Sequence, residues 1–268
     1  MSDAGWAPLV YARTPARDDW WRAVPGLRSG GPPPEWRSAV VHAAVQGGRD
    51  LRHGPRFLLA CAGGTRLVGV ACRAVELSAS MHTDGARELY GFVGWFGRAR
   101  PPELADLRAH YRQWAGAEYE RRLRPVWDLG PTQATPAEPT GPAPGPWGEL
   151  AAADADPLEV GRSGAVEVWP EDDAEQLWRA AAASTEPVVV VTGLRVARPG
   201  RLVGLTHVAS IHVEERQVVV TDRGAEHGVD EGNDEGNNDA ARTASGPPER
   251  RRPVLSQVGT WLRRATGR

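Results

Sequence analysis

Residues 56–96 read RFLLACAGGTRLVGVACRAVELSASMHTDGARELYGFVGWF, and this stretch decides the fold of the 268-residue chain. It contains three apolar runs, which cover residues 57–62, 67–75 and 89–96. A glycine pair and a polar loop separate the runs, and this alternation is typical of an antiparallel β-meander. We therefore expect the chain to be built around a β-sheet.

Gly63 and Gly64 form the shortest connection in the stretch. Glycine reaches positive φ angles without a Cβ penalty, so the pair predicts a tight hairpin turn. That turn places residue 62 opposite residue 65 and residue 59 opposite residue 68, with side chains alternating between two faces. Both faces are largely apolar, which requires cover on both sides of the sheet. We expect helices on one face, and a second sheet or the other half of the chain on the other.

The tetrapeptide Arg66-Leu67-Val68-Gly69 recurs 135 residues later as residues 201–204. A helical pattern and a proline precede both copies, and a further apolar run follows each. Internal duplication and coincidence both remain explanations of four identical residues. The predicted fold class is α+β, with two antiparallel β-meander plus helix units, a disordered proline-rich linker between them and a C-terminal amphipathic helix.

Changes in composition divide the chain into five predicted parts. These are an N-terminal α+β domain (1–128), a Pro/Ala/Gly-rich linker (129–164), a smaller α+β unit (165–222), an acidic disordered spacer (223–250) and a basic amphipathic helix (251–268). The linker and the spacer have too few apolar residues to offset the entropy of ordering them. Trp147 is the one candidate in the linker for holding onto a folded surface.

Three helices are expected, over residues 35–46, 101–124 and 171–183, because prolines or acidic residues open them and apolar residues recur at helical spacing. Trp20 and Trp21 lie in a segment rich in turn-forming residues, and we expect this pair to clamp a loop onto the core.

The last eighteen residues read RRPVLSQVGTWLRRATGR and carry the only candidate binding site that we predict. Apolar residues recur on one helical face, with arginines at its polar end. A docking helix on a flexible tether would bind a groove of a partner protein, return to the acidic part of its own chain or, more weakly, lie on an anionic membrane. The predicted docking residues are Val254, Leu255, Val258, Trp261, Leu262, Arg263 and Arg264.

Charge is distributed unevenly along the chain. Residues 1–130 carry 18 Arg and 13 acidic residues, residues 131–250 carry 9 Arg and 21 acidic residues, and residues 251–268 carry 5 Arg and no acidic residue. Opposed blocks favour attraction within or between chains, and they do not form the basic stripe of a nucleic-acid-binding protein. No lysine occurs, and we attribute this to a GC-rich bacterial coding bias.

Cys61 and Cys72 are the only cysteines, and the hairpin register separates them by more than the reach of a disulfide. Two buried free thiols indicate a reducing compartment, and no leader or membrane-spanning stretch is seen, so a cytoplasmic protein is expected.

Ser78, Ser80, His82, Thr83 and Asp84 form the one polar cluster beside a buried strand. A hydrolase or transferase could use a serine from this loop, or Cys72, as nucleophile, with His82 as base, Asp84 as orienting group, and Arg73 or Arg87 as an anion site. Catalytic triads usually draw on elements far apart in the sequence, so this reading is the alternative. The principal expectation is a non-catalytic bacterial adaptor or accessory subunit that binds another protein, with no catalytic residue, metal ligand or cofactor.

Overall fold

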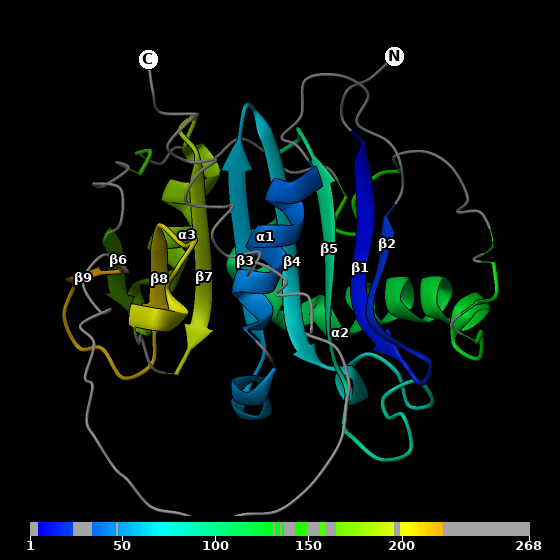
Figure 1. The fold of residues 1–268 in the computed structure, drawn as a ribbon. Coiled ribbons are helices and arrows are strands. Elements are labelled where there is room, and N and C mark those ends of the chain that lie inside the picture. The colour runs from blue at the N-terminus through cyan, green and yellow to red at the C-terminus, as the bar shows by residue number, and fades with distance from the viewer. Residues whose placement is uncertain are drawn as a thin grey trace, which may run out of the picture.

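The computed structural model describes residues 5–23, 34–46, 48–130, 132–134, 136, 143–148, 156–158, 165–195 and 199–221. These residues form a mixed α+β fold around one nine-stranded sheet with the strand order β2-β1-β5-β4-β3-β7-β8-β6-β9 (Figure 1). The predicted α+β class is confirmed.

The strands and helices have the following bounds. The strands are β1 (Trp6–Thr14), β2 (Arg17–Ala23), β3 (Arg56–Ala62), β4 (Thr65–Arg73), β5 (Tyr90–Gly97), β6 (Ala165–Pro170), β7 (Val188–Leu194), β8 (His207–Ser210) and β9 (Gln217–Val220). The α-helices are α1 (Pro34–Val45), α2 (Leu104–Leu123) and α3 (Ala174–Ala183). Five short 3-10 helices complete the described elements: η1 (Arg49–His53), η2 (Ala74–Glu76), η3 (Arg124–Val126), η4 (Glu171–Asp173) and η5 (Pro199–Arg201).

Strands β3, β4 and β5 form the predicted antiparallel meander. Ala62 pairs with Thr65 and Leu59 pairs with Val68, which is the register expected from the glycine turn. Gly63 and Gly64 have φ angles of 56° and 72°, so both occupy the left-handed region that favours glycine. The tight hairpin is therefore confirmed.

The two halves of the chain meet in the middle of the sheet. Strand β3 of the first half pairs antiparallel with β7 of the second half, from Phe57 opposite Thr192 to Cys61 opposite Val188. The two predicted α+β units thus contribute to one continuous sheet.

The second half does not form the predicted antiparallel meander. Strand β8 runs parallel to β7, and β6 lies between β8 and β9. Residues 195–206 connect β7 to β8 and include η5. A parallel pair needs a crossover connection of about this length, whereas a tight turn would join antiparallel strands. Arg201 ends η5 and the rest of the recurring tetrapeptide lies in a turn, whereas Arg66–Gly69 lies inside β4, so the two copies do not mark equivalent elements.

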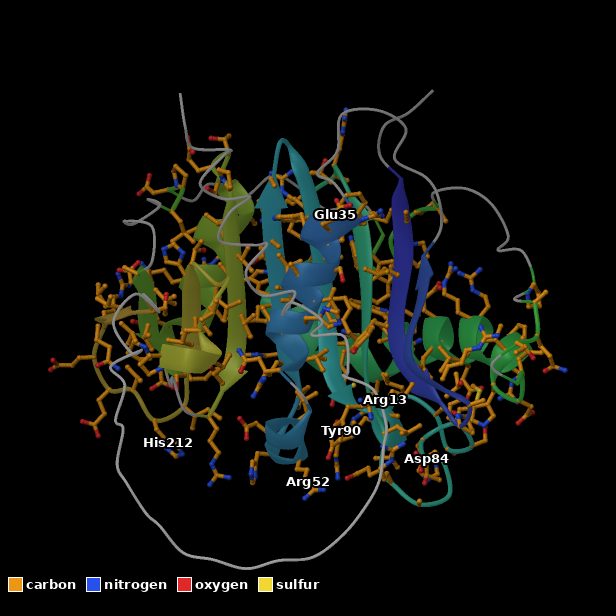
Figure 2. The ribbon with its side chains drawn as sticks, in the orientation of Figure 1. Arg13, Glu35, Arg52, Asp84, Tyr90 and His212 are labelled. Atoms are coloured by element: carbon orange, nitrogen blue, oxygen red, sulfur yellow. The ribbon has the colours of Figure 1, made fainter. Side chains whose placement is uncertain are left out.

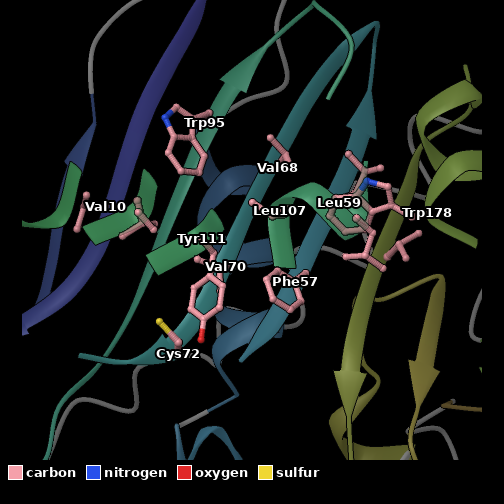
Figure 3. Close-up of a cluster of buried hydrophobic side chains, with 14 of the residues drawn as sticks. Val10, Phe57, Leu59, Val68, Val70, Cys72, Trp95, Leu107, Tyr111 and Trp178 are labelled. Atoms are coloured by element: carbon pink, nitrogen blue, oxygen red, sulfur yellow. The ribbon is translucent and has the colours of Figure 1, made fainter. Parts of the chain in front are cut away.

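Helices cover both faces of the sheet, where we expected helices on one face only. Side chains of α2 and α3 pack against alternate residues of the central strands, such as Phe57, Leu59, Val68 and Val70 (Figure 3). Side chains of α1 pack against the residues in between, which include Leu58, Ala60, Leu67, Val189 and Val191. The two-sided apolar pattern of the strands is thereby buried on both faces.

The N-terminal segment differs from the expectation. Strands β1 and β2 form an antiparallel hairpin, and Trp20 and Trp21 lie in β2 instead of in a clamping loop. The three expected helices are present within a few residues of their predicted bounds. Cys61 and Cys72 are buried free thiols, as predicted. None of the helices in the described part of the chain has the length and apolar character that crossing a bilayer requires.

Candidate protein-interaction surface

The polar loop of the alternative hypothesis connects η2 to β5. The Ser78 hydroxyl donates to a carboxylate oxygen of Glu120 on α2. The same hydroxyl oxygen accepts the Met81 N–H at 3.0 Å and the Ser80 N–H at 3.3 Å. These contacts fold the loop and attach it to α2, because a serine that accepts from the following backbone amides stabilises a turn.

Asp84 stabilises a second turn in the same loop, at the lower edge of the molecule in Figure 2. Its Oδ1 accepts the N–H groups of Ala86 at 3.0 Å and Arg87 at 2.7 Å, and its Oδ2 accepts the Arg87 Nε–H at 2.9 Å. These bonds lower the pKa of Asp84, first through Ala86 and then through Arg87. Both carboxylate oxygens are thus engaged locally, where an orienting group would instead accept from His82.

Cys72, near the end of β4, is fully buried. Burial raises the pKa of the Cys72 thiol well above its ordinary value, and the nearby Glu76 raises it further. The thiolate is the nucleophilic form of cysteine, so this environment disfavours covalent catalysis.

The arginines proposed as anion ligands have carboxylate partners. Arg73 lies 3.5 Å from Glu76 and 3.6 Å from Glu88, and Arg87 lies 2.8 Å from Asp84. Glu76 also accepts the Tyr111 hydroxyl at 2.6 Å, and burial together with this bond raises the pKa of Tyr111 to about 12. The structure therefore does not bring the proposed nucleophile, base and orienting group into the catalytic arrangement of the alternative hypothesis. Within the described ranges, no three His, Cys, Asp or Glu side chains gather as a metal site would require.

An exposed apolar strip lies on β9, the edge strand at the opposite end of the sheet from β2. Val218 and Val220 are each 66% exposed, although they belong to a β-strand. Val219, between them, packs against the core on the α1 side and attaches the strand. Strand β9 pairs with β6 on one side only, and no strand among the described residues pairs with its outer edge (Figure 1). An unpaired edge offers backbone N–H and C=O groups to another chain.

Acidic side chains border this strip. Glu214 and Glu215 are exposed in the turn that leads into β9, and Val218 pairs with Glu167 of β6. Arg216 directly precedes β9, and its charge faces β6 and η4, because its guanidinium stacks 3.3 Å from the centre of the Trp169 ring and its Nε lies 3.6 Å from Asp173. We call Val218 and Val220, together with Glu214 and Glu215, the edge patch. It combines apolar area with negative charge.

The seven predicted docking residues, Val254, Leu255, Val258, Trp261, Leu262, Arg263 and Arg264, lie outside the described residues. The sequence reasoning overlooked the edge patch because the run 217–221 reads as an ordinary apolar strand. The available signal was its position, between a glutamate-rich turn and the acidic spacer at the end of the apolar pattern.

The chain matches no protein-family model, no curated protein and no solved structure.

Proposed function

We propose that the chain is a non-catalytic bacterial adaptor or accessory subunit of the cytoplasm, which binds another protein through the edge patch and the C-terminal segment 251–268. The observation that carries this proposal is the exposure of Val218 and Val220 on β9, whose outer edge pairs with no strand of the described residues. Burying a valine side chain contributes about 1.5–3 kcal/mol, and about two-thirds of that remains to be gained at each position. A partner strand added to β9 would gain this apolar contact together with backbone hydrogen bonds.

The C-terminal segment can reach the same partner. Twenty-nine residues, 222–250, separate Thr221, the last described residue, from Arg251. The sequence predicts a disordered spacer here, and a disordered tether of that length would have a root-mean-square span of about 30 Å. Such a tether would present the C-terminal segment to a partner bound at β9 at an effective concentration of about a millimolar. Its apolar residues would form the docking face of an amphipathic helix, as in helix-in-groove recognition. Strand addition and helix docking on one partner would reinforce each other.

The side chains of the polar loop stabilise the fold, which favours the adaptor over the hydrolase or transferase. Ser78 joins the loop to Glu120, and Asp84 caps its own turn, so each side chain has a function in folding. The free buried thiols Cys61 and Cys72 are consistent with a reducing cytoplasm. The interleaved acidic residues make a protein the preferred partner over nucleic acid or a membrane surface.

The test is affinity capture with the full chain, followed by measurement of the dissociation constant of the captured protein. Two variants remove the proposed contacts: a double variant with Val218→Asp and Val220→Asp, and a chain that ends at Arg250. Each should weaken binding at least about tenfold, which corresponds to about 1.4 kcal/mol. The matched control is Ile211→Asp, which charges another exposed apolar side chain, 55% exposed, outside β9.

The control and a Ser78→Ala variant should bind the partner as the unmodified chain does. Equal binding by all variants would refute the proposed surface. A Ser78→Ala effect on binding without an effect of the Val218 and Val220 changes would instead move the site to the polar loop.

A further inference from the structure

A cluster of aromatic rings lies near the other end of the sheet, on the face covered by α2. Trp6 comes from β1, Trp95 from β5 and Trp114 from α2, and we call these three side chains the tryptophan cluster. Trp147, from the predicted linker, lies among them. Its ring centre is 5.1 Å from that of Trp6, 5.4 Å from that of Trp95 and 6.0 Å from that of Trp114. The ring planes meet at 76°, 82° and 61°, which are edge-to-face arrangements favoured by aromatic quadrupoles.

The segment around Trp147 is attached like a short bound peptide. Ala143 pairs with Trp6 through two backbone hydrogen bonds: the Trp6 N–H donates to the Ala143 carbonyl at 2.8 Å, and the Ala143 N–H donates to the Trp6 carbonyl at 3.0 Å. The Trp147 ring folds back over Gly145, where a Cβ would lie 2.6 Å from the ring. Residues 143–148 read APGPWG, so two prolines and a glycine present the ring.

This attachment has the two parts of a peptide-recognition site. A backbone pairing fixes the register of the segment, and an aromatic surface accepts one anchoring side chain. Proline restricts the unbound conformations of the segment, which lowers the entropy cost of binding. His110 stacks on Trp114 at 5.0 Å with a 20° angle between the planes and is itself exposed, so the aromatic surface continues to solvent.

We propose that the tryptophan cluster is a binding surface for a proline-rich segment of a partner protein that presents a tryptophan. Residues Ala143–Gly148 of the chain occupy it in the resting protein as an exchangeable internal ligand. The surface is formed by β1, β5 and α2, whereas the edge patch lies on β9, far from β1 and β5 in the strand order. This proposal therefore goes beyond the adaptor function proposed above and does not depend on it.

The internal segment competes with a partner segment for the surface. The apparent affinity of the partner segment equals its intrinsic affinity multiplied by the fraction of time that the surface is open. A tethered ligand acts at an effective concentration of about a millimolar, and an external segment must compete with it. Loosening the internal segment should therefore strengthen binding of an external peptide in a graded manner. A fixed structural staple would not show this gradation.

The test uses a fluorescent peptide with the sequence of residues 141–150, GPAPGPWGEL, and measures its binding to the full chain by anisotropy. Trp147→Ala removes the internal anchor and should strengthen peptide binding at least about tenfold. Ala143→Pro keeps Trp147 but removes the N–H that donates to Trp6, and should strengthen binding about threefold to tenfold. Trp127→Ala, which removes another partly buried tryptophan outside the cluster, should leave the affinity unchanged.

A peptide with alanine in place of its tryptophan should not bind any of these proteins. The proposal is overturned if the tryptophan peptide fails to bind the Trp147→Ala chain. It is also overturned if Ala143→Pro binds no better than the unmodified chain, because the segment would then be a fixed staple. The Ala143→Pro arm decides the question even if the Trp147→Ala chain does not fold, since it leaves every ring in place.

Discussion

Replacing Gly193 by alanine tests how the two halves of the sheet are joined. Gly193 lies in β7 with a φ angle of 78°, and an added Cβ would lie 2.7 Å from the Pro55 carbonyl oxygen, next to β3. The left-handed conformation costs alanine about 1–2 kcal/mol. Displacing a packed backbone oxygen adds about 1–3 kcal/mol, as overpacking does in cores. The expected loss in the free energy of unfolding is therefore about 2–5 kcal/mol.

The matched control is Gly64→Ala in the β3–β4 turn. Gly64 has a φ angle of 72°, but nothing lies within 4 Å of its added Cβ. This variant should lose only the conformational part, about 1–2 kcal/mol. Both values can be measured by urea unfolding followed by far-UV circular dichroism. If Gly193→Ala lowers the free energy of unfolding no more than Gly64→Ala does, the close contact between Gly193 and the Pro55 carbonyl is contradicted.

Three further predictions concern buried groups. Trp178→Phe removes the Nε1–H that donates to the Pro102 carbonyl at 2.9 Å and leaves that oxygen buried without its donor. The free energy of unfolding from urea titrations should fall by about 1–3 kcal/mol. An unchanged urea midpoint would contradict this hydrogen bond. Burial raises the pKa of Glu171 above its ordinary value of 4.5 more than the Gly193 N–H and Arg108 lower it. The native state therefore binds the Glu171 proton more tightly than the unfolded state does. The free energy of unfolding of the unmodified chain, relative to that of Glu171→Gln, should fall as pH rises from about 4.5. If this difference rises with pH instead, the raised pKa of Glu171 is contradicted. Burial raises the pKa of Cys61 to about 11 and that of Cys72 well above the ordinary range. Iodoacetamide at pH 8 should therefore label neither thiol until urea unfolds the chain, which mass spectrometry can measure. Labelling of either thiol in the folded chain would refute the burial.

Local patterns predicted the central strands because their structure depends on neighbouring residues. The turn at Gly63 and Gly64 fixes which residues face each other in β3 and β4, and the alternation of apolar residues fixes their faces. The same reasoning located α2, whose apolar positions recur at helical spacing.

The order of strands in the second half depends on contacts far apart in the sequence. Strand β6 lies between β8 and β9, although α3 and β7 separate β6 from both along the chain. The sequence pattern identified these strands as apolar runs, but neighbouring runs were assumed to pair with each other. The same limitation concealed the β1–β2 hairpin, because Asp18 and Asp19 of β2 are residue types typical of turns.

The roles of the polar residues were equally hard to predict. In the sequence Ser78 is a candidate nucleophile, whereas in the structure its hydroxyl donates to Glu120, which lies 42 residues away on α2. Whether Val218 and Val220 are buried or exposed depends on whether β9 is a central or an edge strand, which only the strand order reveals. Trp147 was the one candidate in the linker for holding onto a folded surface, and its ring lies among those of Trp6, Trp95 and Trp114.

Hydrogen exchange of the backbone amides of Gln217–Val220 tests the proposed edge contact most directly. The outer edge of β9 has no paired strand among the described residues, so its outward amides should exchange rapidly in the isolated chain. Adding the captured partner should slow exchange at β9, and this protection should be lost in the double variant with Val218→Asp and Val220→Asp. If the bound partner protects amides elsewhere while β9 continues to exchange at its original rate, the edge patch is not the docking surface.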